Sequence, residues 1–565
     1  MLDVTIEHDV CATMRDGVVL RADVYRPIGD GPWPVLLARM PYGKQVPAIL
    51  AMLDPAGIAR RGFIVVIQDT RGRFASDGEW EPWTFETDDG HDTVRWAAAL
   101  PASNGSVGMF GPSYLGNTQW MAALSKPPEL KAIAPAATWS EPNDGLFSRG
   151  GAAELGISLP WSLMQGLDRV LRRYADDPMA KGQALAALIR DFDAVAEMGY
   201  RELPAGRHPA FVRHDIPELG FERSLRDPAW TESCRVAGRH SEVDLPSLHI
   251  GGWYDIFCQG TLDNFMAMRA AGRPANLIVG PWCHSDRNGH VGDVNFGMGA
   301  NGELVGFRGS LTDIQVGWFT RWLDAGDTAG EPDSPGTELP PVLLFVTGTN
   351  EWREEQEWPL SRAVDTELFL RADGRLAHDP PGPAEGTDTF IYDPADPVPT
   401  TGGALLMSSE FRAGPLDQHK VEARPDVLVY STEPLAADVE VTGRIRAFIH
   451  ATTDAPTTDW VARLCDVDTE GVSRNIADGI VRAVATPGEF VEHVLDLWST
   501  CHVFRAGHRI RVHITSSNFP RWERNLNTGE PSECGTSSRP ARQLVAHDAT
   551  RLSRVVLPII PASTG

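Results

Sequence analysis

The first third of the chain alternates short apolar runs rich in β-branched residues with stretches of helical periodicity. The segment from Asp88 to Leu100 has apolar residues at helical spacing and acidic residues at its start, where they favour the helix dipole. A second helix is predicted over Thr118–Ser125. Strands that alternate with helices are typical of a mostly parallel sheet with helices on both faces. Strands are predicted at Val4–His8, Val18–Tyr25, Val35–Arg39, Phe63–Gln68, Val107–Phe110 and Leu130–Ala134.

The pattern changes between Ser140 and His240. Arg- and Ala-rich helical stretches broken by Pro and Gly replace the β-branched runs, which indicates an inserted helical cap. The alternating pattern then resumes with a strand at Leu248–Gly251, a helix at Thr261–Ala270 and a strand at Asn276–Val279. Two further strands of the same sheet are therefore predicted.

Beyond Pro340 the helical periodicity almost disappears, and short strands alternate with turn residues. This pattern is typical of an antiparallel sandwich or jelly roll. The predicted segments are 1–139 and 241–350 for the two parts of an α/β core, 140–240 for the cap, and 351–565 for a C-terminal β-sandwich of jelly-roll type. Strands of this region are predicted at Pro341–Val346, Thr366–Leu370, Asp426–Tyr430, Glu440–His450, Trp460–Val467, His493–Leu497 and Arg509–Ser516.

Length and charge narrow the architecture and the partners. A chain of 565 residues exceeds what one hydrophobic core usually supports, so about two to four structural units are expected. The 76 acidic residues outnumber the 51 basic ones and give a formal net charge of −25. Nucleic acids and anionic membranes bind clusters of Lys and Arg, so this balance argues against both as partners.

Cysteine usage and the N-terminus predict a cytoplasmic protein. The seven cysteines are scattered and never spaced C-x-x-C, which indicates neither a disulfide framework nor a zinc site. The N-terminus alternates like a strand and lacks the basic start and apolar run typical of a signal peptide, and no uncharged run approaches the ~20 apolar residues of a membrane helix. The sequence DVDTEG at 466–471 resembles half of a calcium loop. Its final ligand position falls on Ala477, which has no carboxylate, so a hairpin turn and no metal are predicted.

The stretch Gly108–Trp120, GMFGPSYLGNTQW, places Ser113 between a predicted strand and a predicted helix. Such a turn presents the serine hydroxyl at the carboxyl edge of the sheet, as in the nucleophile elbow of serine hydrolases. The usual elbow reads G-x-S-x-G, whereas here Leu115 stands at the second flank and Gly116 follows it. A turn or helix-capping serine is the alternative interpretation. Ser106 in NGSVG also has flanking glycines, but it precedes the strand instead of ending it.

A serine nucleophile needs a base within hydrogen-bond reach and a carboxylate that orients the base. Asp255 ends the predicted strand SLHIGGWYD, and His284 follows the one in NLIVGPWCH. Both come after Ser113, in the Ser, Asp, His order of α/β-hydrolases. Active groups gather outside the carboxyl ends of parallel strands, so the three are predicted to form a catalytic triad. Taken singly, Asp255 also fits a helix N-cap and His284 a loop histidine.

Several motifs give the chain an end-to-end resemblance to a known family. It resembles the bacterial cocaine esterase branch of the hydrolase family that includes Xaa-Pro dipeptidyl peptidases, glutaryl acylases and α-amino acid ester hydrolases. In that family the elbow is itself written G-x-S-Y-x-G. The motifs are MRDGVVLRADVYRP (14–27), MPYGK (40–44), VVIQDTRGRFASDGEW (65–80), GMFGPSYLG (108–116), GGWYD (251–255), GPWCH (280–284), YDPADPVPTTGG (392–403) and SSNFPRWERN (516–525).

The resemblance implies an α/β-hydrolase core with an inserted helical cap and a C-terminal jelly roll. It also implies roles for five residues: Ser113 as nucleophile, His284 as general base and acid, Asp255 as its orienting partner, and the Tyr42 hydroxyl with the Tyr114 N–H as oxyanion hole. A phenolic donor suits this role because its O–H points at the developing negative charge. The reaction expected is two-step acyl transfer without a cofactor, and relatives allow a homodimer. Read from the residues alone, Tyr42 is a half-buried aromatic.

The residues around Asp255 favour an ester with an apolar acyl group. The following Ile256, Phe257 and Cys258 cannot pair with a charged amine, so amino acid ester hydrolysis is disfavoured. Trp161 falls where the cocaine esterase branch has a pocket tryptophan, whereas Leu146 stands where it has a second one. Plain packing is an equal interpretation of Trp161.

An esterase acting on a small molecule is therefore predicted. The alternatives are an Xaa-Pro dipeptidyl peptidase or acylase that cleaves amides and, more remotely, a non-catalytic carbohydrate-binding protein. The extra N-terminal helical domain of Xaa-Pro dipeptidyl peptidases from lactic bacteria is missing here, because the predicted sheet begins almost at residue 4.

Overall fold

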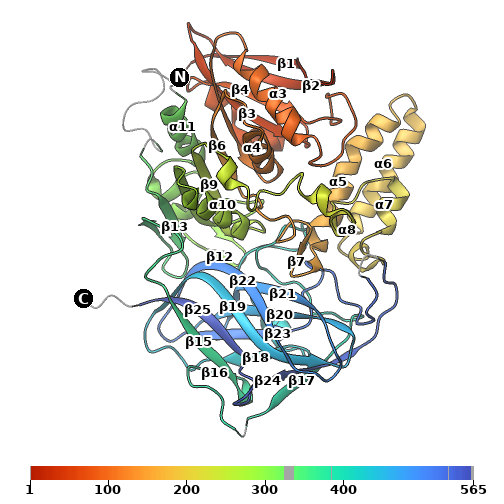
Figure 1. Cartoon of the computed structure of the whole chain (residues 1–565), viewed down its shortest axis with the longest axis vertical. Coiled ribbons are helices and arrows are strands. Elements are labelled where there is room, and N and C mark those ends of the chain that lie inside the picture. The colour runs from red at the N-terminus through yellow and green to blue at the C-terminus, as the bar shows by residue number, and fades with distance from the viewer. Residues whose placement is uncertain (1, 324–335, 337, 384, 532–533, 562–565) are drawn as a thin grey trace.

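An α/β core, a helical cap and a sandwich-like β domain make up the computed structural model of the chain (Figure 1). The structure describes residues 2–323, 336, 338–383, 385–531 and 534–561. The core and the C-terminal β domain lie at opposite ends of the molecule, and the cap helices lie beside the core. The predicted fold class is confirmed.

The core contains a mostly parallel sheet, as the alternating pattern predicted. Within the described residues it has ten strands in the order β1-β2-β4-β3-β5-β6-β9-β10-β13-β14. Neighbours from β4 to β13 pair in parallel, whereas β1, β2 and β14 join the edges antiparallel. β14 extends this sheet to Glu355, past the boundary expected at residue 350. The strands are β1 (Val4–Thr13), β2 (Val19–Pro27), β3 (Trp33–Met40), β4 (Ile64–Asp69), β5 (Ser103–Pro112), β6 (Leu130–Ala136), β9 (Ser247–Tyr254), β10 (Ala275–Cys283), β13 (Val342–Val346) and β14 (Glu351–Glu355).

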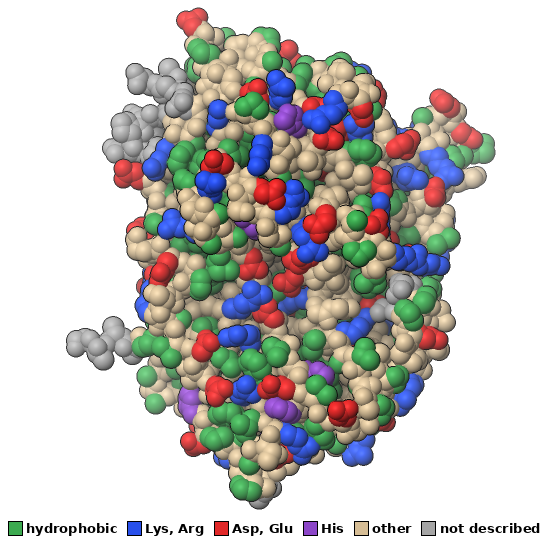
Figure 2. All heavy atoms as spheres, viewed as in Figure 1, with side chains coloured by type: hydrophobic (Ala, Val, Ile, Leu, Met, Phe, Trp, Pro, Cys, Tyr) green, Lys and Arg blue, Asp and Glu red, His purple; other side chains and the backbone are tan. Residues whose placement is uncertain are grey.

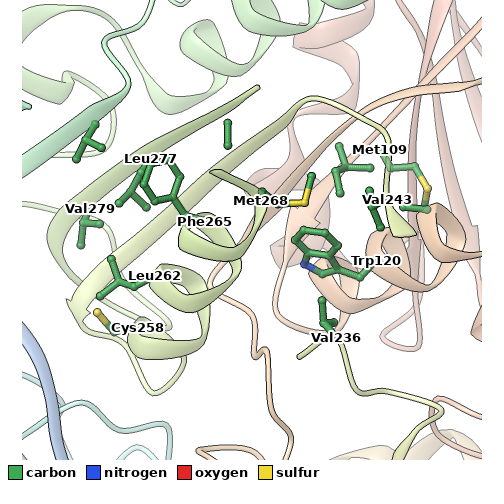
Figure 3. Packing of buried hydrophobic residues seen from close by; sticks show 14 of the residues in the cluster. Met109, Trp120, Val236, Val243, Cys258, Leu262, Phe265, Met268, Leu277 and Val279 are labelled. Atoms are coloured by element: carbon green, nitrogen blue, oxygen red, sulfur yellow. The ribbon is translucent and has the colours of Figure 1, made fainter. Parts of the chain in front are cut away.

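Helices cover both faces of this sheet. The apolar sides of α3, α4 and α10 pack on one face, and those of α1, α2 and α11 pack on the other. Figure 3 shows part of the face covered by α3, α4 and α10: Trp120 of α4 and the α10 side chains Leu262, Phe265 and Met268 lie there with Leu277 of β10. Strands buried on both faces read as continuous apolar runs, which explains the runs in the sequence. The helices are α1 (Pro47–Leu53), α2 (Pro55–Ala59), α3 (Glu86–Ala98), α4 (Tyr114–Leu124), α10 (Cys258–Ala270) and α11 (Leu311–Trp322).

The cap is helical, and its helix α5 continues through an internal proline. Pro160 has no N–H to donate to the carbonyl of Gly156, four residues earlier in α5. The hydroxyl of Tyr200 donates to this carbonyl instead, at 2.9 Å. A side chain from a later part of the cap thus replaces the missing helical hydrogen bond. The cap elements are β7 (Ser148–Arg149), β8 (Ala152–Ala153), α5 (Leu155–Arg173), α6 (Pro178–Asp193), α7 (Pro209–His214), α8 (Phe221–Arg226) and α9 (Pro228–Thr231).

The C-terminal domain is sandwich-like and has its own apolar core. Within the described residues eleven of its strands belong to one sheet. The hairpin turn predicted at 466–471 joins β20 to β21. The jelly-roll topology stays a prediction. The strands are β15 (Val364–Arg371), β16 (Arg375–Ala377), β17 (Thr387–Tyr392), β18 (Leu428–Ser431), β19 (Val439–Thr453), β20 (Thr457–Val467), β21 (Ser473–Val484), β22 (Val491–Phe504), β23 (Arg509–Thr515), β24 (Ala541–Ala546) and β25 (Arg554–Ile560).

The surface carries charges of both signs. On the face seen in Figure 2, Lys and Arg side chains lie interspersed with Asp and Glu side chains. Among the helices of the described ranges, none combines the length and the apolar character needed to cross a bilayer.

Candidate active site

Ser113 occupies a strained turn between β5 and α4. Its φ of 62° and ψ of −124° lie outside the regions that non-glycine residues ordinarily adopt. α4 begins at Tyr114, whereas the sequence pattern predicted its start at Thr118. The sharp turn therefore places the first turn of the helix directly behind the serine, as a nucleophile elbow does.

The late second glycine of the elbow has a steric reason. At Gly111, which has a φ of +122°, an added Cβ would lie 2.7 Å from a methyl carbon of Leu115. At Gly116 an added Cβ would lie 2.6 Å from the Cβ of Thr138, in the segment after β6. Leu115 thus folds back over Gly111, and the close approach to the neighbouring segment falls one residue later than in the usual spelling.

Asp255 and His284 form a hydrogen-bonded pair at the carboxyl ends of β9 and β10. Nδ1 of His284 lies 3.0 Å from Oδ2 and 3.2 Å from Oδ1 of Asp255. The backbone N–H of Phe257 donates to Oδ1 of Asp255 at 2.7 Å, and its ring lies edge-on to the imidazole at 5.3 Å. Asp255 is buried, and the His284 side chain is 11% exposed. The carboxylate of Asp255 therefore orients the imidazole through Nδ1. Among the described residues none hydrogen-bonds to Nε2, so this nitrogen is available to exchange a proton.

The serine and the histidine are not hydrogen-bonded among the described residues. Ser113 directly follows β5, and His284 directly follows β10, with β6 and β9 between these strands in the sheet. Catalytic hydrogen bonds commonly tighten only when the substrate binds, so the lack of a hydrogen bond between Ser113 and His284 does not weigh against a triad.

Tyr42, just after β3, brings its hydroxyl to Ser113. Burial raises the pKa of Tyr42, and hydrogen bonds with Trp161 and Ser113 oppose this shift. Tyr114 is the first residue of α4, so its backbone N–H has no intrahelical acceptor. One phenol and one backbone N–H are thus available beside the elbow.

The side chain of Tyr114 anchors the elbow from below. Its hydroxyl donates to Oε1 of Glu86 at 2.8 Å and accepts from the backbone N–H of Trp83 at 3.0 Å. Burial, followed by the charge of Glu86, raises the pKa of Tyr114 well above its usual value. Arg39 donates to the other oxygen of Glu86 at 2.8 Å, so the carboxylate is held on both sides.

An aromatic cluster surrounds the site and contains all three predicted pocket residues, Trp161, Phe257 and Leu146. Its central ring is Trp83, which the sequence reasoning missed. The ring stacks on Tyr114 at 5.6 Å and on Trp161 at 6.0 Å. Trp83 follows the motif at 65–80 by three residues, so position next to that motif was the available signal. The other rings that contact Trp83 edge-on are those of Trp139, Phe147 and Trp230.

A serine elbow at the carboxyl edge of a mostly parallel sheet, under a helical cap, defines the class of α/β-hydrolase serine hydrolases. Sequence comparison narrows this class. The chain belongs to the X-Pro dipeptidyl-peptidase (S15) family, which matches residues 16–286, and residues 336–556 match the X-Pro dipeptidyl-peptidase C-terminal non-catalytic domain. It is accordingly a serine hydrolase.

Relatives align with the chain over nearly its whole length. It is 36% identical to the cocaine esterase of Rhodococcus sp. (strain MB1 Bresler), covering 98% of this chain and 99% of that protein. An aminopeptidase from a marine sediment archaeon, Thaumarchaeota archaeon, is 25% identical with a TM-score of 0.78, covering 99% of this chain and 97% of the other. A selenomethionine-labelled α-amino acid ester hydrolase is 24% identical with a TM-score of 0.80 and the same coverage, and this likeness concerns the fold.

Proposed function

We propose that the protein hydrolyses carboxylic esters of small molecules through an acyl-enzyme. Ser113 attacks the ester carbonyl while His284 takes its proton, and Asp255 keeps the imidazole in the required tautomer. The alcohol leaves with a proton from His284, and water then hydrolyses the acyl-enzyme by the same route. The observation that carries the proposal is the strained turn at Ser113, because such strain persists only where the surrounding structure enforces it.

The oxyanion that forms in each step needs donors already in place. The Tyr42 hydroxyl and the Tyr114 N–H are proposed for this role, because both lie at the elbow and neither requires a rearrangement of the backbone. Preorganised donors of this kind contribute about 3–4 kcal/mol each to transition-state stabilisation. No step of this scheme requires a cofactor.

An uncharged acyl group suits the surroundings of the pair. Ile256, Phe257 and Cys258 are each at most 2% exposed and provide no carboxylate for a substrate amine. Glu86 is the buried carboxylate behind the elbow, but Arg39 and Tyr114 already bind it. This supports an ester with an apolar acyl group over a substrate with a free ammonium. Cleavage of amides, as the family name and the archaeal aminopeptidase suggest, is the second candidate.

Active-site labelling combined with a substrate panel tests this function. A fluorophosphonate is expected to form an adduct on Ser113 in the folded protein, and Ser113→Ala to lose the adduct and lower kcat for p-nitrophenyl esters by several orders of magnitude, at least ~10³-fold. Wild-type protein is expected to cleave these esters faster than a Gly-Pro anilide.

Three results would redirect the assignment. An adduct on another serine, or retained activity in Ser113→Ala, places the nucleophile elsewhere. Faster cleavage of the anilide makes the protein a peptidase. A folded protein that takes no label and cleaves neither substrate would favour the non-catalytic alternative.

A further inference from the structure

The indole of Trp161 and the hydroxyl of Tyr42 are hydrogen-bonded, with Nε1 donating to the phenolic oxygen at 3.3 Å. An indole N–H is only a donor, whereas a phenol both donates and accepts. Trp161 therefore occupies a lone pair of the Tyr42 oxygen. The hydroxyl hydrogen of Tyr42 is thus left to point away from the indole toward another acceptor, and Ser113 lies beside the same hydroxyl.

The direction of this hydrogen decides whether Tyr42 helps the reaction. A phenol stabilises an oxyanion only when its O–H points at that oxygen, and a hydroxyl turned the other way presents a lone pair to negative charge. We propose that Trp161 is a positioning residue that sets the hydrogen-bond direction of Tyr42, and that Arg73 holds the two side chains together. This inference rests on the proposed function, because it assigns Tyr42 to the oxyanion hole.

Arg73 binds both sides of this contact. Its Nε donates to the carbonyl of Pro41, the residue before Tyr42, at 2.9 Å. Its Nη1 donates to the carbonyl of Gln165 at 3.1 Å, and its Nη2 donates to Oε1 of Gln165 at 2.8 Å. Gln165 follows Trp161 by one turn of α5, on the same face of the helix. The guanidinium of Arg73 thus links the backbone next to Tyr42 to α5, the helix that carries Trp161.

The surroundings make Arg73 a rigid link. Its side chain is 3% exposed, and its guanidinium lies over the ring of Trp80 at 4.4 Å. Burial lowers the pKa of Arg73 to about 10, so the group stays charged near neutral pH. Asp168 of α5, 3.6 Å from Nη1, balances this charge and also accepts from the N–H of Phe74 at 3.1 Å. Removal of Arg73 or Asp168 would leave the polar groups that it binds buried and without a partner.

Packing alone makes a different prediction for Trp161. The ring also stacks on Trp83 and contacts Trp80, so a purely steric pocket role would change substrate binding and raise KM. Control of the Tyr42 hydroxyl acts on the transition state and lowers kcat. It also requires that the effect of Trp161 vanish when the hydroxyl is absent.

A double-mutant cycle between Trp161→Phe and Tyr42→Phe separates these roles. We expect Trp161→Phe to lower kcat for a p-nitrophenyl ester about 10-fold with KM changed less than about 2-fold, since one hydrogen bond is lost and a ring remains. In the Tyr42→Phe background, the same change is expected to lower kcat less than about 2-fold. Arg73→Lys, which keeps the charge but not the fork, is expected to lower kcat in the same hydroxyl-dependent way.

The controls separate this inference from the proposed function. Trp318→Phe in α11 removes an indole that donates to Asn276 at 3.2 Å, remote from the elbow, and is expected to leave kcat unchanged. Additive losses from Trp161→Phe and Tyr42→Phe, or an effect confined to KM, would overturn the inference while leaving the esterase assignment intact. If Tyr42→Phe itself leaves kcat unchanged while Ser113→Ala abolishes activity, Tyr42 is not the oxyanion donor and the inference falls with that role.

Discussion

At the residue scale, the absence of a side chain at Gly116 makes room for the segment that follows β6. Thr138 donates its hydroxyl to the carbonyl of Ser113 at 2.9 Å, so the segment opposite the glycine is itself part of the support of the elbow. A side chain at residue 116 would displace that segment and the serine together. The absence of a side chain at Gly116 therefore helps to shape the turn that carries Ser113, the proposed nucleophile.

Gly116→Ala is expected to lower the free energy of unfolding by about 1–3 kcal/mol, because its Cβ would overlap Thr138. The matched control is Gly182→Ala in α6, where an added Cβ meets nothing within 4 Å. There alanine is expected to stabilise by about 0.5–1 kcal/mol, since it is the better helix former. Denaturant unfolding measures both, and equal effects at the two glycines would contradict the steric explanation.

α5 connects the cap to the edge of the core that carries Tyr42 and Arg73. Its face carries Trp161, Gln165 and Asp168, which contact Tyr42 and Arg73. One turn further, Arg172 donates to the carbonyls of Phe74 and Ser76, at 3.0 Å each. The position of α5 therefore affects the geometry of Tyr42, the proposed oxyanion donor, and Pro160 lies immediately before Trp161.

Tyr200→Phe is expected to loosen α5. It removes the hydroxyl that donates to the carbonyl of Gly156 in place of the N–H that Pro160 lacks. An unsatisfied buried carbonyl costs about 1–3 kcal/mol. Hydrogen exchange of residues 155–173 is expected to accelerate in this variant. In Pro160→Ala the helix regains its own N–H donor, so adding Tyr200→Phe there is expected to cost less. Equal acceleration in both backgrounds would show that the hydroxyl acts elsewhere.

At the scale of the whole molecule, buried charge joins the cap to the C-terminal domain. Arg149 of β7 lies over the ring of Trp498 at 3.6 Å and donates to the carbonyl of Asp478 at 2.7 Å. Glu154, at the start of α5, accepts from Nε1 of Trp522 at 2.7 Å. The C-terminal domain thus supports the end of the helix that leads to Trp161.

Glu154→Gln tests this junction through the pH dependence of stability. Burial raises the pKa of Glu154 from 4.5 to about 7, against the opposing charge of Arg521. The folded chain therefore keeps a proton that the unfolded chain releases, and stability falls as pH rises from about 4.5 to about 7. In Glu154→Gln the amide oxygen can still accept from Trp522, and this part of the pH dependence is expected to disappear. Thermal unfolding across that pH range measures it, and an unchanged slope would refute the assignment.

Much of the fold, and the placement of the three candidate catalytic residues at the ends of strands, could be predicted from the sequence. Strands and helices of the core appear as local periodicity, and Ser113, Asp255 and His284 each follow a strand whose carboxyl end must face the same edge of a parallel sheet. The start of α4 was predicted four residues late, because the turn at Ser113 depends on contacts with β6 and its following segment. The hydrophobic periodicity of a short segment carries no information about its contacts with distant segments.

Trp83, Arg73 and the bond between Trp161 and Tyr42 could not be predicted in this way. Trp161 is 119 residues from Tyr42, and Arg73 is 92 residues from Gln165. The sequence by itself determined the elements, their order and the three groups at their ends, because these depend on neighbours in the chain. Only the tertiary structure decided which side chains surround those groups and which way a hydroxyl points, because side-chain contacts and hydrogen-bond directions arise where distant segments pack together.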